Sequence, residues 1–147
     1  MLNERYGPGM NDRIAAMFAQ RGLPPYAPPA DVVSNSRAAL RVGELARENG
    51  VFAEYHGRVM EAYWTEGRDI GDHAVLHDLA AEIGLGAEEV ADVLGSSRYL
   101  DFVEASTQQA ASIGVSGVPA FLLDGRLLVV GAQPEEVFEQ AFAQLDS

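Results

Sequence analysis

Few side chains in this chain have the types and spacing that catalysis requires. The 147 residues include no cysteine, which excludes disulfides, thiolate metal sites and a cysteine nucleophile. His73 and His77 lie four residues apart in a helical pattern, a spacing at which two histidines can share a metal. No glutamate lies between them in the metalloprotease arrangement and no third ligand is placed, so a solvated helix end is the better interpretation. We predict no metal site.

Other nucleophile arrangements do not assemble either. The chain has no Gly-x-Ser-x-Gly turn and no glycine-rich phosphate loop after a strand. Ser116 lies in a glycine-containing turn, but no base is placed beside it. We therefore predict no catalytic residue, which leaves binding surfaces as the candidate functional features.

The most informative stretch is GVSGVPAFLLDGRLLVVGAQP, residues 114–134. Two short apolar runs are joined at Asp124-Gly125, which predicts a β-hairpin. Neither run alternates with polar residues, and such strands are usually covered on both faces. Because an isolated hairpin is marginal in water and an open edge invites pairing, we expect something to cover Phe121–Leu123. The cover could be a helix of this chain, a second copy of the chain or a missing segment.

The rest of the chain predicts helices in series. Apolar residues recur at helical spacing in 10–22, from Ser34 or Asn35 to about 50, in 51–67, from Asp69 or Asp72 to about 83, around 90–94, and in about 97–113. Residues 23–31 hold four prolines and predict an extended connector. A last helix follows Pro134. The side chains expected to face a core are Leu40, Leu45, Ala46, Val75, Leu76, Leu79, Ala80, Ile83, Val90, Val93, Leu94, Val137, Phe138, Ala141, Phe142 and Leu145.

An aromatic stripe runs along residues 51–64. Phe52, Tyr55, Tyr63 and Trp64 lie on one broad face of the predicted helix, which should be packed on two sides. Such a stripe could line a groove for an apolar substrate. Core packing is the more common role, so we expect most of it in the core, with Tyr63 or Trp64 partly exposed. His56 is expected at the edge of that face.

The composition excludes some classes of partner. With 10 basic and 22 acidic residues the formal charge is −12, so phosphate backbones would be repelled and we predict no nucleic-acid partner. No apolar run reaches the length of a membrane span, so we predict no membrane partner. The first ten residues lack a basic-then-apolar leader pattern, and a cytoplasmic location is the default expectation.

Residues 114–134 resemble the C-terminal half of the thioredoxin fold in the DsbA family, and more narrowly its FrnE-like branch, in which a helical insertion precedes this hairpin. The segments NSRAAL at 35–40 and AYWTEGRDIGDHAVLHDLAAEIGL at 62–85 also match that insertion. The resemblance implies a mostly helical α/β chain. Residues 1–113 would be helical, with the insertion domain from about 34, and 114–147 would be the ββα half of a thioredoxin fold.

The resemblance also implies what this chain lacks. The family's first half is a strand, a helix opening with Cys-x-x-Cys and a second strand, and this βαβ half is absent here. The absent strand is the one that would pair with Ala120–Leu123. We expect a truncated form of a longer oxidoreductase, with a natural short protein as the alternative.

The Val118–Pro119 pair is the first candidate binding feature. In thioredoxin-like proteins the matching proline is cis, and the preceding backbone pairs with an extended peptide or with glutathione. The resemblance thus implies that Gly117, Val118 and Pro119 contact a peptide or protein carrying a thiol or disulfide. A trans proline that simply begins a strand is the alternative.

Gln133 is the second candidate. Residues 131–134 precede a helix, and N–H groups at a helix N-terminus can hold an anion. In glutathione-using relatives this turn holds the γ-glutamyl carboxylate, but the motif there carries Asp and Arg where this chain has Gln133 and Pro134. A plain helix cap is the alternative. We predict no cofactor, with glutathione as the alternative.

Three functions follow from these observations. The first is a DsbA-like thiol–disulfide oxidoreductase without catalytic cysteines, inactive by itself. The second is a non-enzymatic module that binds peptides or a partner, such as a chaperone. The third is a glutathione-dependent isomerase or transferase of the 2-hydroxychromene-2-carboxylate isomerase type. In each we expect a homo-oligomer or a missing-segment partner to cover the strand edge at Phe121–Leu123.

Overall fold

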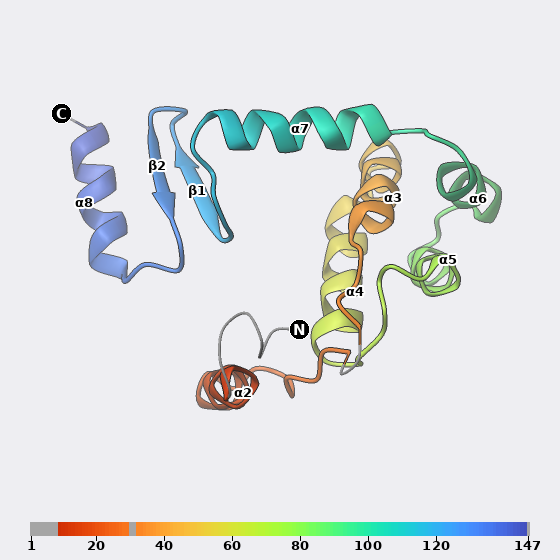
Figure 1. Ribbon diagram of the computed structural model, residues 1–147, viewed down its shortest axis with the longest axis horizontal. Coiled ribbons are helices and arrows are strands. Elements are labelled where there is room, and N and C mark those ends of the chain that lie inside the picture. The colour runs from red at the N-terminus through yellow and green to blue at the C-terminus, as the bar shows by residue number, and fades with distance from the viewer. Residues whose placement is uncertain (1–8, 30–31, 147) are drawn as a thin grey trace. The chain divides into compact units, whose positions relative to one another are not determined.

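The computed structural model describes residues 9–29 and 32–146, and the chain forms two compact units, Met1–Val103 and Glu104–Ser147. Seven helices and one two-stranded sheet occur within the described residues, in the order helices then hairpin then helix (Figure 1). They are α2 (Met10–Gln20), α3 (Arg37–Glu48), α4 (Phe52–Trp64), α5 (His73–Glu82), α6 (Ala87–Gly95), α7 (Leu100–Ser112), β1 (Ala120–Leu123), β2 (Leu127–Val130) and α8 (Glu135–Leu145). The predicted mostly helical α/β fold class is confirmed.

The first unit is built around one apolar core. Helices α3, α4, α5 and α6 contact one another, and Leu45, Leu76 and Leu79 are the largest fully buried side chains between them. Burying one such leucine is favourable by about 1.5–3 kcal/mol. The remaining core side chains are Ala39, Val42, Ala46, Tyr55, Val59, Ala62, Ala80, Leu85, Val90, Val93 and Leu94. The core predictions for α5 and α6 are therefore confirmed.

One prediction for α3 is wrong. Leu40 was expected to face the core, but its side chain is 53% exposed. The buried face of α3 consists of Ala39, Val42, Leu45 and Ala46, which recur at helical spacing. Leu40 follows Ala39 by one residue and is therefore turned about 100° away from that face.

Polar side chains and glycines fix where the helices begin and end. Asp72 accepts a hydrogen bond from the backbone N–H of Ala74 at 2.8 Å, so of the two predicted caps for α5 it is Asp72 that binds. Before α3, the Asn35 side chain accepts from the N–H of Arg37 at 3.1 Å. Gly67, after α4, has a φ of 67°, a left-handed conformation that favours glycine. No helix within 9–29 and 32–146 is long and apolar enough to cross a membrane.

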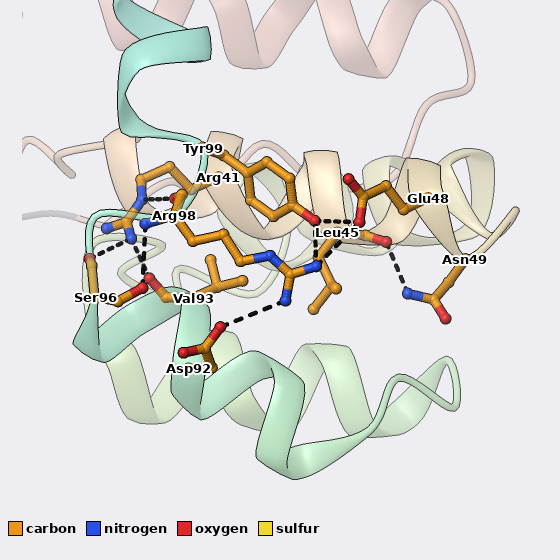
Figure 2. Close-up of polar contacts among 9 residues, drawn as sticks. All are labelled: Arg41, Leu45, Glu48, Asn49, Asp92, Val93, Ser96, Arg98 and Tyr99. Atoms are coloured by element: carbon orange, nitrogen blue, oxygen red, sulfur yellow. Dashed lines mark hydrogen bonds and ion pairs between the residues drawn. The ribbon is translucent and has the colours of Figure 1, made fainter.

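A buried arginine orders the connection between α6 and α7. The Arg41 guanidinium donates to the carbonyl oxygens of Ser96 at 2.6 Å and Arg98 at 2.8 Å, and also to that of Val93 (Figure 2). These carbonyls lie at and beyond the end of α6, where a helix leaves acceptors unsatisfied. The helix predicted from Ser97 instead begins at Leu100, because residues 96–99 curve around the guanidinium and Tyr99 adopts a φ of 63°.

In the second unit, β1 and β2 pair antiparallel, with Phe121 opposite Val129. Asp124 and Gly125 both have positive φ, at 50° and 64°, as in the type I′ turns that the Asp-Gly pair favours. Helix α8 contacts β2, and Phe138 meets Phe121 edge-on at 5.1 Å between ring centroids. Ala141 is buried as predicted, but Val137 and Phe142 are exposed, so their predicted burial is wrong.

Candidate functional site

Two loops meet at the end of the hairpin opposite its turn. The N–H of Gly131 donates to the carbonyl of Pro119 at 2.8 Å, which continues the ladder one residue beyond the pairing of Ala120 with Val130. The loop before β1 and the turn after β2 therefore lie side by side. This contact brings the candidates Gly117, Val118 and Pro119 to the same end of the hairpin as Gln133.

The loop before β1 presents its side chains to solvent. Val118 is 92% exposed, Gly117 and Pro119 are exposed, and the Val118–Pro119 peptide bond is cis. A Cβ atom added at Gly117 would meet nothing within 4 Å. An apolar side chain held this far into water, two residues before β1, is a candidate contact for another polypeptide.

The edge of β1 offers backbone groups to the same partner. Because Gly131 bonds to Pro119, the hydrogen-bonded pairs of the ladder alternate from there, and Ala120 and Leu122 fall at the non-bonded positions. Their N–H and C=O groups therefore point away from β2. The side chains of Phe121 and Leu122 are exposed within the same strand. An added extended strand would find donors, acceptors and apolar surface there.

The turn after β2 uses its polar groups internally. The side-chain amide nitrogen of Gln133 donates to the carbonyl oxygen of Val130 at 2.8 Å. The backbone N–H of Gln133 donates to the carbonyl oxygen of Gly131 at 3.0 Å. Glu135 and Glu136 occupy the first turn of α8 and add negative charge. This arrangement fits a turn that begins a helix better than it fits an anion-binding site. Gln133 nevertheless lies in a groove of about 360 Å³ between β2 and α8, which Leu128, Val130, Val137 and Gln140 also line.

The aromatic stripe divides between the core and a pocket. Tyr55 is buried in the core and its hydroxyl donates to the carbonyl of Ala39 at 3.1 Å; burial raises the pKa of Tyr55 well above its usual range. Trp64 stacks on Tyr26 at 5.8 Å and meets Tyr63 edge-on at 4.6 Å, in a half-exposed cluster. Phe52 lines a pocket between α3 and α4 together with His56.

The two histidines that could have shared a metal are considered first, and then the contacts of Arg41. His73 and His77 lie on α5, and within the described ranges no three histidines, aspartates or glutamates gather closely enough to hold a metal ion. Sequence reasoning missed Arg41, whose partners lie 52–57 residues away. It offered a groove along the aromatic stripe only as the less common alternative, and Phe52 and Tyr55 of that stripe do line a pocket, together with His56. A cation next to the apolar face of α3 is the only local signal for Arg41.

Comparisons with known proteins identify the family. Residues 3–143 match the DSBA-like thioredoxin domain. The crystal structure of a probable DsbA oxidoreductase from Streptomyces coelicolor has a TM-score of 0.84 and 34% identity, and the match covers 98% of this chain and 64% of that one. A crystal structure of a candidate protein disulfide isomerase from Nitrosomonas europaea has a TM-score of 0.68 and 22% identity over 90% of this chain and 70% of that one, a likeness of fold alone.

One curated relative matches in sequence. The uncharacterized protein YwbO of Bacillus subtilis is 31% identical over 100 residues, which are 67% of this chain and 50% of YwbO. The chain thus spans half the length of that relative and less than two thirds of the Streptomyces protein. The family match extends over nearly every residue of both compact units. The chain belongs to the DSBA-like thioredoxin domain family.

Proposed function

We propose that this chain is the polypeptide-contacting part of a DsbA-like thiol–disulfide oxidoreductase, in which Gly117, Val118 and Pro119 contact an extended substrate. One observation carries the proposal. Val118 is held almost fully exposed two residues before β1, between the exposed residues Gly117 and Pro119. An extended substrate can form main-chain hydrogen bonds with this loop and side-chain contacts at Val118.

The chemistry of exchange has to come from another source. Thiol–disulfide exchange needs a thiolate that attacks a disulfide sulfur, and this chain has no cysteine. The chain by itself therefore holds a substrate without reacting with it. The resemblance implies a Cys-x-x-Cys helix between two strands, and the first of those strands would lie along β1. We propose residues 1–113 as the helical part and 114–147 as the ββα half that this segment completes.

A partner strand at β1 is part of the same proposal. An exposed strand edge with apolar side chains favours association. We expect either a second copy of the chain or a segment carrying the missing strand to cover Phe121–Leu123. Light scattering of the purified chain should show a dimer or a larger assembly. A monomer would contradict the second copy as the cover of Phe121–Leu123.

Binding is tested on the ¹⁵N-labelled chain, with reduced and alkylated insulin B chain as an extended polypeptide. Saturable amide shifts are expected at Gly117 and Val118, because we expect a partner strand to cover the β1 edge at Phe121–Leu123. Val118→Asp should weaken binding about tenfold, since it places a charge in an apolar contact. Val33→Asp is the matched control, because Val33 is also an exposed valine outside any helix or strand. Equal weakening by the two variants would contradict the proposed site.

Chemistry is tested separately by insulin reduction. The chain alone should give the rate of buffer, and activity above that rate would contradict the proposed absence of catalysis. The chain is then mixed with the part of the Streptomyces relative that it does not match. Restored reduction supports the oxidoreductase, whereas binding without restoration supports the second candidate, a non-enzymatic peptide-binding module, which the same exposed edge favours.

A further inference from the structure

A pocket of about 220 Å³ opens between α3 and α4 within the first compact unit. Its walls are mainly aliphatic and aromatic side chains. Leu40 and Met60, both on these helices, are 53% and 43% exposed. The complete lining consists of Ser36, Ala39, Leu40, Gly43, Glu44, Arg47, Phe52, Tyr55, His56, Val59, Met60 and Ile70.

The volume limits what can enter. An apolar cavity of about 150 Å³ holds a benzene molecule, whereas sites for drug-sized ligands usually measure about 300–1,000 Å³. The pocket between α3 and α4, at about 220 Å³, lies between these sizes. It fits one aromatic ring with a short linker, which is the size of a single aromatic side chain.

The walls favour an aromatic group over an aliphatic one. Phe52 and His56 stack with their ring centroids 5.7 Å apart, and the edge of the Tyr55 ring lies 3.7 Å from where a Cβ of Gly43 would be. Met60 adds a thioether, which makes favourable contacts with rings. A ring inserted here would meet other π-systems and a sulfur, and such contacts add about 0.5–1.5 kcal/mol beyond area burial.

The charged groups of the pocket select a neutral occupant. Glu44 and Arg47 form an ion pair at 3.3 Å, and the Arg47 guanidinium lies 3.8 Å from the centroid of the Phe52 ring. The pair carries no net charge, so a charged ligand would meet a like charge beside the opposite one and would gain little from its charge. A peptide backbone is neutral and carries both a donor and an acceptor, so its N–H suits Glu44 and its C=O suits Arg47. The charges therefore complement a peptide group.

We propose that this pocket binds one aromatic side chain of an extended polypeptide, with the flanking peptide groups held by Glu44 and Arg47. An apolar anchor surrounded by polar groups is the usual arrangement at protein interfaces. The inference rests on the proposed function only for the class of partner, because the residues that carry it all lie between Ser36 and Ile70.

The test uses the whole chain with ¹³C-labelled methionine methyl groups and the peptide acetyl-Gly-Ser-Phe-Ser-Gly-amide. The methyl signal of Met60 should shift saturably, whereas that of Met17, which is also on a helix and 40% exposed, should not move. The same peptide with alanine in place of phenylalanine should bind about tenfold more weakly or not at all. No shift at Met60 up to millimolar peptide, or an equal shift with the alanine peptide, overturns the proposal.

Variants and a small probe identify the occupant. By fluorescence anisotropy, Met60→Glu and Leu40→Glu should weaken binding about tenfold, whereas Met17→Glu should not. If acetyl-phenylalanine-amide binds as tightly as the peptide, the pocket takes small molecules and the polypeptide proposal is overturned. The other site is followed by amide shifts at Val118 in a chain that also carries ¹⁵N, titrated with the insulin B chain. Shifts at Met60 without shifts at Val118 then support the pocket and contradict the proposed function, whereas shifts at Val118 without shifts at Met60 support the proposed function and contradict the pocket.

Discussion

The two compact units differ most in what they bury. In the first, fourteen apolar residues form one cluster among α3, α4, α5 and α6. In the second, only Val129 and Ala141 are buried among residues 104–146. Each unit has strong local patterns, and α8 and α3 are similar in length. The difference is therefore in packing partners and not in helix or strand propensity.

This difference separates a stable scaffold from a dependent surface. Four mutually packed helices gain enough from apolar burial to offset the entropy of ordering them. A hairpin and one helix with two buried side chains gain much less, and a two-stranded hairpin is marginal by itself. Segments of low local stability are also those that bind and rearrange. The hairpin's exposed edge and its weak core therefore have the same cause.

The sharpest test of the comparison is one core truncation in each unit. Leu76→Ala removes a fully buried side chain from the first unit and should lower the free energy of unfolding by about 3 kcal/mol. Val129→Ala in the second unit should lower it by less than about 1 kcal/mol, because few partners surround it. Urea unfolding followed by circular dichroism measures both.

Val130→Ala, at an exposed position of the same strand, is the control for Val129→Ala. It should leave the unfolding midpoint unchanged. Equal losses for Leu76→Ala and Val129→Ala would mean that the hairpin unfolds with the helical core as one cooperative body, and the contrast between the units would be wrong.

The next largest effect is expected at Arg41. Arg41→Met keeps the length of the side chain but removes the donors to Val93, Ser96 and Arg98, at a cost of about 3 kcal/mol in unfolding free energy. Arg98→Met is the control, since Arg98 lies at the surface and pairs with Glu48 and Asp92; it should lower the urea midpoint much less than Arg41→Met does. Hydrogen exchange should quicken at residues 98–100 in the first variant only.

Arg41 also shows where prediction from the sequence ends. Helical spacing located every described helix, and it assigned Leu76, Leu79, Val90 and Val93 to the core correctly. Those residues lie in the middle of broad apolar faces, where the 3.6-residue period is enough to predict which side chains are buried. The carbonyls that Arg41 binds lie more than fifty residues away in sequence. No local pattern encodes such a contact, and the late start of α7 follows from it.

The errors at Leu40 and Phe142 have a related cause. Each is an apolar residue next to a buried face, and helical spacing cannot say how wide the packed part of that face is. Leu40 lines the pocket between α3 and α4, where we propose that an aromatic side chain binds. For the proline loop the sequence named Gly117, Val118 and Pro119 through the resemblance, and their role in binding stays a prediction.

A smaller effect is expected at Tyr55. Tyr55→Phe keeps the ring in the core but leaves the carbonyl of Ala39 without its hydroxyl donor, which should cost about 1 kcal/mol. Because burial raises the pKa of Tyr55, the hydroxyl favours folding below pH about 10 and this contribution is lost as the pH rises further. Urea midpoints at pH 8 and 11 should therefore differ less in Tyr55→Phe than in the unmodified chain.

The smallest effect concerns the exposed carboxylate of Glu48. The Tyr99 hydroxyl and then the Arg98 guanidinium, at 3.0 Å, donate to it and lower its pKa (Figure 2). A lowered pKa stabilises the folded state above the pKa of an unfolded glutamate, about 4.3, and this stabilisation is lost as the pH falls through the lower folded value. Glu48→Gln should thus narrow the difference between unfolding midpoints at pH 7 and pH 3. An unchanged difference in Glu48→Gln would show that the contacts around Tyr99 add nothing to the stability of the first unit.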